Sequence, residues 1–196
     1  SGLWSVLRLS EDEVLKGSLL ITLYENLRWK TISPQGFRDE MLAYLPNESN
    51  SLLFSMALSY LGDCQRIFPS DSRPLEQVLW KIVTTNPVSQ HRLQAFRLYR
   101  SIADSEEAVQ RLYTLWQERK APKDCALSES DYIGLSYILA IHLPEKADKI
   151  IATQLSRIQN PDRKKEYQFI SPSVSPRKAE RDSVFASLLI AGNRRV

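Results

Sequence analysis

The placement of prolines and capping residues constrains this fold more than any other feature of the sequence. A capping side chain before a proline favours the first turn of a helix, because the missing N–H of proline would be unpaired there anyway. This pair occurs at Ser33-Pro34, Asn86-Pro87, Asn160-Pro161 and Ser175-Pro176. Ser10, with Glu13 three residues later, predicts a capping box. The chain is therefore expected to fold as helices joined by short loops.

Apolar side chains follow these starts at helical spacing. They predict about ten helices, which begin near Ser10, Ser33, Asn47, Pro74, Asn86, Asp104, Ser128, Pro144, Asn160 and Ser175. No segment alternates apolar and polar residues with the period of two that a half-buried strand requires. We therefore predict an all-α fold.

The helix starts recur in pairs. The caps that open successive pairs stand at positions 10, 47, 86, 128 and 160, about 40 residues apart. A helical hairpin repeated at about this period is typical of an armadillo- or HEAT-like superhelical solenoid. A plain helical bundle is the alternative, although bundles usually have fewer and longer helices. We expect one helical-repeat domain over residues 1–196.

Composition and charge narrow the function classes. No apolar run is long enough to span a membrane, and the net charge is only +3. Residues 157–196 carry nine basic and four acidic side chains, which is too dilute for a nucleic-acid interface. Cys64 and Cys125 lack the spacing of a metal site. We expect no nucleic-acid partner and no membrane span, and the compartment stays open.

The sequence also lacks the residue patterns of common active sites. His91 and His142 lie on different predicted helices, without a second histidine four residues away. We interpret His91 as a solvated helix residue and His142 as a favourable charge at a helix end. The four tryptophans are expected to pack in the core or between repeats. We therefore expect no catalytic residue, no metal ligand and no cofactor in this chain.

One segment, Asn160–Pro172, carries three consecutive cations, Arg163, Lys164 and Lys165, in the first turns of a helix. Cations at this end oppose the helix dipole. A solvated helix face is the simpler interpretation, because charge runs are usually solvated. The alternative is a clamp for an anion or a carboxylate.

Several segments resemble the C-terminal helical domain of bacterial zinc aminopeptidases of the aminopeptidase N and leukotriene hydrolase family. The resemblance extends from about residue 10 to the end of the chain. It is carried by LYEN at 23–26, HRLQAFRLYRSIADSEEAVQRLYTLW at 91–116, KAPK at 120–123, LSESDY at 127–132 and RIQNPDRKKEYQFISPSVSPRKAERDSVFASLL at 157–189.

This resemblance implies that the chain is a piece of a larger enzyme. The residues at its two ends, Ser1-Gly2 and Arg195-Val196, suggest the same. The catalytic domain of the same parent chain and its peptide substrates would be the partners. The helical domain would cover the catalytic cleft and limit peptide access, and the zinc and its ligands would lie upstream of it. In some members an Arg-x-Lys pair lies near the substrate's C-terminal carboxylate. Arg163 and Lys165 have that spacing, although Phe169 and Pro172 are offset from the family's pattern.

An independent armadillo- or HEAT-like scaffold is the alternative function. Such a scaffold would bind a protein partner in its concave groove, and the fold alone does not choose between the two. An H-E-x-x-H helix a few hundred residues before Ser1 in the natural reading frame would favour the aminopeptidase.

Overall fold

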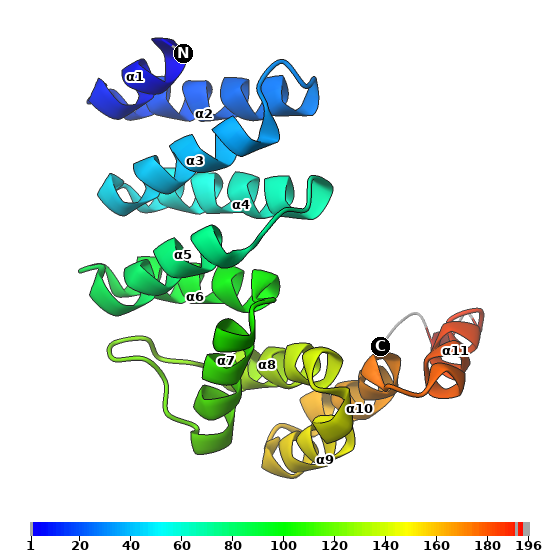
Figure 1. Cartoon of the computed structure of the whole chain (residues 1–196). Helices are drawn as coiled ribbons and strands as arrows, with labels where there is room; N and C mark the ends of the chain where they lie inside the picture. Colours follow the sequence, from blue (N-terminus) through cyan, green and yellow to red (C-terminus); the bar gives the residue numbers. More distant parts are fainter. Residues whose placement is uncertain (1, 191, 194–196) are drawn as a thin grey trace. The chain divides into compact units, whose positions relative to one another are not determined.

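The computed structural model describes residues 2–190 and 192–193 (Figure 1). This part of the chain holds eleven α-helices and three short 3-10 helices, and it contains no strand. The predicted all-α fold class is confirmed. The chain divides into two compact units. The first extends to Ser105 and includes Pro122–Ala126, and the second holds Glu106–Ala121 and the residues from Leu127 onward.

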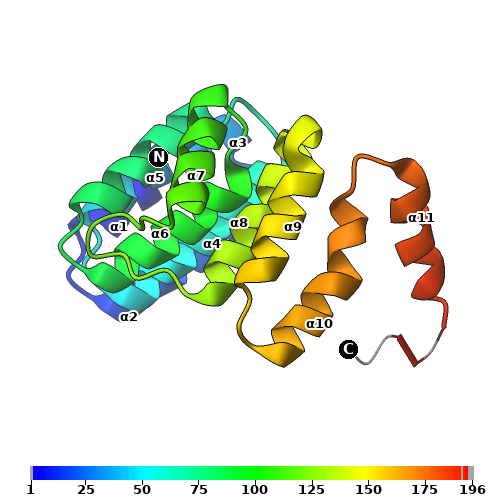
Figure 2. The ribbon, with the colours of Figure 1, turned by 90° about the horizontal axis from the view of Figure 1, so that it is seen from below.

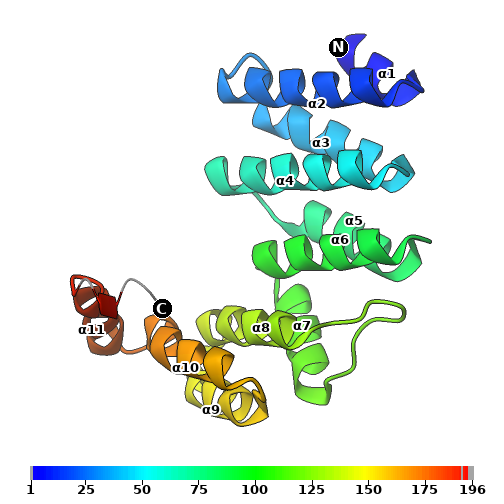
Figure 3. The same cartoon turned by 180° about the vertical axis from the view of Figure 1, so that it is seen from behind.

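The first unit contains six α-helices in two rows. Helices α2, α4 and α6 lie side by side in one row, and α1, α3 and α5 lie against them (Figures 1 and 3). Their bounds are α1 Gly2–Leu9, α2 Glu13–Arg28, α3 Pro34–Tyr44, α4 Ser51–Ile67, α5 Arg73–Thr85 and α6 Ser89–Ile102, with the 3-10 helix η1 at Leu45–Asn47.

The core of this unit lies between the two rows. It is formed by apolar side chains at helical spacing, such as Leu20, Leu23 and Leu27 on α2 and Phe54 and Leu61 on α4, all fully buried. Burial of each side chain of this size contributes about 1.5–3 kcal/mol to the free energy of folding. The apolar stripes therefore turn inward, while the outer faces are mixed, with exposed apolar residues such as Val14 and Leu52.

The second unit contains five α-helices, of which α8, α9 and α10 are neighbours (Figure 2). Its buried aromatic side chains are Trp116, Tyr132 and Tyr167, and Gln154 accepts a 2.8 Å hydrogen bond from the indole N–H of Trp116. The elements are α7 Glu106–Glu118, α8 Glu129–His142, η2 Pro144–Lys146, α9 Ala147–Arg157, α10 Pro161–Ile170, η3 Ser171–Val174 and α11 Lys178–Ser187.

Helix α11 differs from the other described α-helices because none of its residues is buried. Phe185 is 79% exposed, and Leu189 and Ile190, which follow the helix, are 77% and 62% exposed. The helix contacts η3. Val184 is half-buried, so the exposed apolar surface lies at Phe185, Leu189 and Ile190.

Three predicted helix starts are confirmed by their capping bonds. The Ser33 side chain accepts from the N–H of Gly36, Ser128 forms a capping box with Asp131, and Asn160 accepts from the first turn of α10. Glu13 lies in the first turn of α2, and Glu106 and Glu107 lie in the first turn of α7. The other two predicted starts before prolines are displaced: α6 and α11 begin after Val88 and Arg177, two residues beyond the positions that Asn86 and Ser175 would cap.

Two other predicted caps are wrong by a few residues. Asp12, not Ser10, caps α2, because its carboxylate accepts from the N–H groups of Val14 and Leu15 at 2.9 and 3.0 Å. A carboxylate is the stronger acceptor for these N–H groups. Asn50, not Asn47, caps α4 in the same way. The sequence offered several capping residues within one turn, and each time the later one was used.

Two further expectations are corrected. The sequence reading missed α1, a short helix that buries Trp4 and Leu7. It also assigned all four tryptophans to packing, whereas Trp29 is 79% exposed. Trp29 is the C-cap of α2, where the chain leaves the helix and its side chain is not on the buried stripe.

Candidate functional site

The predicted carboxylate clamp lies on α10. Asn160 positions the first turn, since its side chain accepts from the N–H groups of Asp162 and Arg163 at 3.0 Å. Arg163 donates to Glu129 across 3.3 Å, so it pairs with an acid of the same unit, which counts against a clamp. The Glu129 carboxylate also accepts from the backbone N–H of Gln159 at 2.9 Å. This N–H, together with the Arg163 guanidinium, holds the pKa of Glu129 below its usual range.

Arg163 and Lys165 are both exposed, but the structure does not bring them to one side. Residues two apart on an α-helix point in roughly opposite directions, because each residue turns the chain by about 100°. Arg163 is directed toward Glu129, so Lys165 leaves the helix on another side. The joint clamp therefore stays a prediction without geometric support, and Arg163 already has an acidic partner.

His91 is the main correction to the sequence-based site analysis. It is fully buried rather than solvated, and its ring stacks on Phe54 with 4.0 Å between centroids. Burial lowers the pKa of His91 more than the nearby Glu48 raises it. The polar neighbours Gln90 and Arg92 suggested a solvated face, but they point to other sides of α6 than the imidazole.

The His91 imidazole also contacts a hydroxyl, since Nε2 lies 3.0 Å from Ser51 Oγ. A serine beside a histidine is the arrangement of a nucleophile and its base. Here Nδ1 has no hydrogen-bond partner to orient the ring, and no part of the ring is exposed. Ser51 is half-buried and the imidazole is fully buried, so we interpret the pair as part of the packing between α4 and α6.

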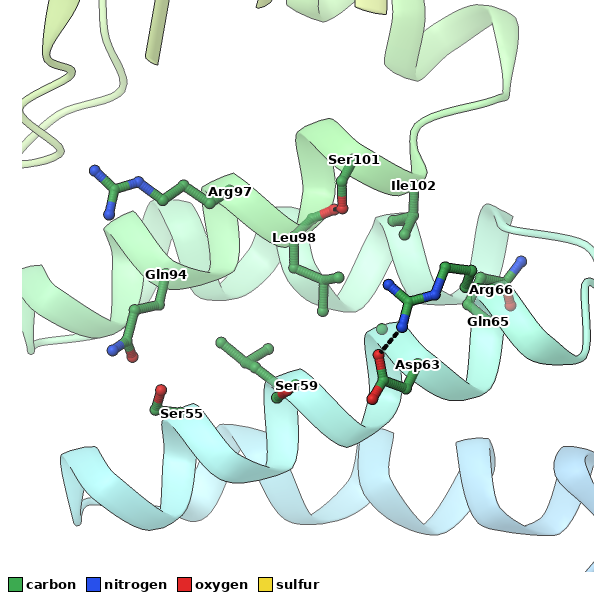
Figure 4. A pocket seen from close by; sticks show the side chains of 12 residues that line it. Ser55, Ser59, Asp63, Gln65, Arg66, Gln94, Arg97, Leu98, Ser101 and Ile102 are labelled. Carbon is green, nitrogen blue, oxygen red and sulfur yellow. Dashed lines mark hydrogen bonds and ion pairs between the residues drawn. The ribbon is translucent and has the colours of Figure 1, made fainter. Parts of the chain in front are cut away.

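A groove on the polar face of the first unit offers the clearest place for a ligand. It runs between α4 and α6 and has a volume of about 580 Å³ (Figure 4). Its floor forms where the two helices approach closely, because a Cβ on Gly62 would meet the Leu98 side chain at 2.9 Å. The lining residues are Ser55, Leu58, Ser59, Gly62, Asp63, Gln65, Arg66, Gln94, Arg97, Leu98, Ser101 and Ile102.

The polar groups of this groove differ in how they are paired. Asp63 accepts from Arg66 at 2.5 Å and from the Tyr24 hydroxyl at 3.0 Å. Tyr24 in turn stacks on Tyr60, with 4.1 Å between ring centroids. By contrast, the side-chain oxygen Oε1 of Gln94 is buried without a hydrogen-bond partner. Buried acceptors are rarely left in this state.

The sequence reading missed this groove, although a signal was present. Ser55 and Ser59 stand four residues apart on α4, and Arg97 and Ser101 stand four apart on α6, on the faces away from the apolar stripes. Two such polar rows on neighbouring helices indicate an exposed surface. They do not indicate that the surface is hollowed, which depends on Gly62.

The described residues contain neither a cluster of metal ligands nor a helix that could span a membrane. No group of three or more His, Cys, Asp and Glu side chains in this part of the chain is placed to hold a metal ion. Zinc therefore has no fit here, and no chemical step is assigned to it. None of the helices in residues 2–190 is long and apolar enough to cross a bilayer.

Comparisons with protein-family models, with curated proteins and with solved structures give no significant match to this chain.

Proposed function

We propose that this chain is a non-catalytic helical domain of a zinc aminopeptidase. In this role it covers the catalytic cleft of its parent enzyme and limits the access of peptides. We also propose that its helical hairpins form an armadillo- or HEAT-like solenoid. The two rows of helices in the first unit support the solenoid, because stacked hairpins place alternate helices in separate rows.

The observation that carries the proposal is the uncovered apolar surface at α11. Phe185, Leu189 and Ile190 are all more than 60% exposed, and this ten-residue helix buries none of its own residues. Isolated helices of this length are marginal in water. A larger body that covers α11 would explain these residues, and α11 lies within the segment that resembles the zinc aminopeptidases.

The natural reading frame before Ser1 tests the proposal. An H-E-x-x-H helix, followed by a distal glutamate, would support a catalytic zinc domain in the same chain. The activity test uses the parent enzyme with and without residues 2–196. Loss of these residues is expected to change the relative rates for dipeptides and long peptides, since access to the cleft would no longer be limited.

Two outcomes would overturn the proposal. One is a reading frame without any zinc motif. The other is a truncated parent that is stable and cleaves short and long peptides in the same ratio as the full chain.

The carboxylate clamp has its own test in the parent. Replacement of Arg163 by alanine is expected to raise KM for a free tripeptide and to leave KM for the C-terminally amidated tripeptide unchanged. An equal effect on both would show that Arg163 serves only its pairing with Glu129.

An independent scaffold that binds a protein partner is the second candidate. The groove between α4 and α6 favours it, because a solenoid of this kind would bind its partner on such a face. A natural chain without a zinc motif that still binds peptides in this groove would select this function.

A further inference from the structure

The segment between α7 and α8 is a long loop without a helix (Figures 1 and 3). The five residues in its middle, Pro122–Ala126, belong to the first unit, whereas α7 before them and α8 after them belong to the second. We call these five residues the strap. We propose that the strap opens and closes over a cavity at the start of α6, and that the Arg92 guanidinium is the latch that holds it closed.

The strap and the start of α6 are separated by an open space. This cavity has a volume of about 640 Å³. Where a space of this size lies between two surfaces, their side chains lack the close contacts that hold a core together. The packing between the strap and α6 is therefore incomplete. The lining residues are Ser89, Gln90 and Leu93 on α6, and Pro122, Asp124, Cys125 and Ala126 on the strap.

Few side chains of the strap are buried. Cys125 is 3% exposed and Pro122 is half-buried, whereas Lys123, Asp124 and Ala126 are exposed. Segments with few buried apolar contacts open locally at a free energy well below that of global unfolding. The burial of the strap is thus typical of a segment that opens while the rest of its unit stays folded.

The backbone of the strap forms a turn that does not need α6 to keep its shape. The N–H of Cys125 donates to the backbone oxygen of Pro122 at 3.0 Å. Asp124, inside this turn, has a φ of 56°, in the left-handed region that glycine favours and aspartate tolerates. Because its own hydrogen bond closes the turn, the strap can leave α6 as one preformed piece.

Arg92 joins the strap to α6. Its Nη1 atom donates to the backbone oxygen of Lys123 at 3.0 Å and to the carboxylate of Asp124 at 3.1 Å. Its Nε atom donates to the backbone oxygen of Asn86, just before the helix. The Arg92 side chain is 12% exposed, and hydrogen bonds from a charged donor are stronger than neutral ones. These contacts, rather than apolar packing, hold the strap in its closed position.

Two cysteine thiols can report on the opening. Cys125 lies in the strap, and Cys64 is fully buried on α4 of the same unit. Labelling of the full 196-residue chain by N-ethylmaleimide is followed at each cysteine by mass spectrometry, and each rate is divided by its rate in concentrated urea. Cys125 is expected to react at least about tenfold faster than Cys64.

The urea dependence of these rates separates local from global opening. The rate at Cys125 is expected to change little in dilute urea, because opening of the strap exposes little surface, whereas the rate at Cys64 is expected to rise steeply. Equal rates that rise together with urea would show that the strap opens only when the whole unit unfolds, and would overturn the proposal.

Replacement of Arg92 tests the latch. Arg92→Met keeps the apolar stem and removes the guanidinium, so the ratio of the Cys125 rate to the Cys64 rate is expected to rise about tenfold or more. Arg73→Met is the matched control, because Arg73 is an exposed arginine of the same unit, pairs with Asp71 and does not line the cavity. If Arg92→Met left the ratio unchanged, or raised both rates equally, Arg92 would not be a latch.

Asp124→Asn separates the ion pair from the backbone contact. Asparagine also tolerates the left-handed turn, and the Asp124 side chain is 56% exposed, so loss of its charge is expected to raise the ratio less than about fivefold. A rise as large as that of Arg92→Met would show that the exposed ion pair closes the strap, and would overturn the role given to the backbone contact of Arg92.

The outcome does not depend on the proposed function. Every residue of the strap and of its latch lies in the first unit, and the experiment needs no peptide, zinc or parent enzyme. A strap that opens on its own supports this inference with or without a zinc motif upstream. A strap that stays closed until the unit unfolds rejects this inference alone.

Discussion

Replacement of Glu76 by alanine is expected to destabilise the first unit more than any replacement of an exposed acid. Glu76 lies in the first turn of α5 and is only 4% exposed. Its carboxylate accepts from the backbone N–H groups of Asp104 and Ser105 at 2.8 and 3.1 Å, and from the hydroxyls of Ser72 and Ser105. One side chain thus joins the start of α5 to the segment that follows α6.

The magnitude follows from these four bonds. A hydrogen bond to a charged group contributes about 1.5–3 kcal/mol, so a simple sum would reach about 6–12 kcal/mol. That sum is too large, because the bonds share one carboxylate and Asp104 is exposed, so that water can replace the lost acceptor. We expect Glu76→Ala to cost about 3 kcal/mol and Glu76→Gln about 1 kcal/mol, since the amide keeps one oxygen.

Acid should weaken the same contact. Burial alone would raise the pKa of Glu76, but the hydrogen bonds from Ser105, Asp104 and Ser72 outweigh burial and hold this pKa below its usual range. A carboxyl group with a lower pKa in the folded state stabilises the fold above its ordinary pKa, and this contribution is lost as the pH falls. The Gln variant cannot titrate, so its stability should depend less on acid pH.

Urea unfolding followed by circular dichroism measures these free energies. Glu25→Ala is the control, because the Glu25 side chain is about half exposed (47%) in the same unit and pairs only with Arg28 among the described ion pairs. It should change stability by less than about 0.5 kcal/mol. The reasoning would be refuted if Glu76→Ala changed stability as little as Glu25→Ala, or if the Gln and Ala variants lost equal amounts.

Three further predictions concern other buried or capping groups. Because burial outweighs Glu48 and lowers the pKa of His91, stability should fall as the pH drops below about 6.5, and His91→Phe should flatten this dependence in thermal melts at pH 5.5 and 7.5. Gln154→Leu should leave the Trp116 indole N–H without an acceptor and cost about 1–3 kcal/mol in urea unfolding, whereas a neutral effect would mean that water replaces the amide. Asn160→Ala should cost about 1 kcal/mol through loss of the α10 cap, and Asn160→Asp, which keeps the acceptor, should restore most of it.

Helix starts could be predicted best where a single capping residue stands before the helix. Ser33 and Ser128 could be identified as caps because a small polar acceptor precedes a helix that cannot start earlier. Asn47 failed because Asn50 offers the same chemistry three residues later, and the choice depends on where the preceding 3-10 helix ends. Local chemistry thus predicts that a helix begins, while packing decides at which residue.

The site was harder to predict, because it depends on contacts between helices. Nothing in the neighbourhood of His91 reveals that Phe54, 37 positions earlier, stacks on its ring. The groove likewise needs Gly62 on one helix opposite Leu98 on another. Arg163 could be recognised as part of a charged turn, but its pairing with Glu129 joins residues 34 positions apart.

The lack of buried residues in α11 has a consequence for how tightly a covering body could hold the chain. Without that body, the free energy that keeps α11 helical is small, so its amide hydrogens should exchange with solvent far faster than those of α4. Docking would then have to order the helix as well as cover it, and the ordering entropy would be subtracted from the affinity. The contact at α11 would therefore be weaker than its apolar area suggests.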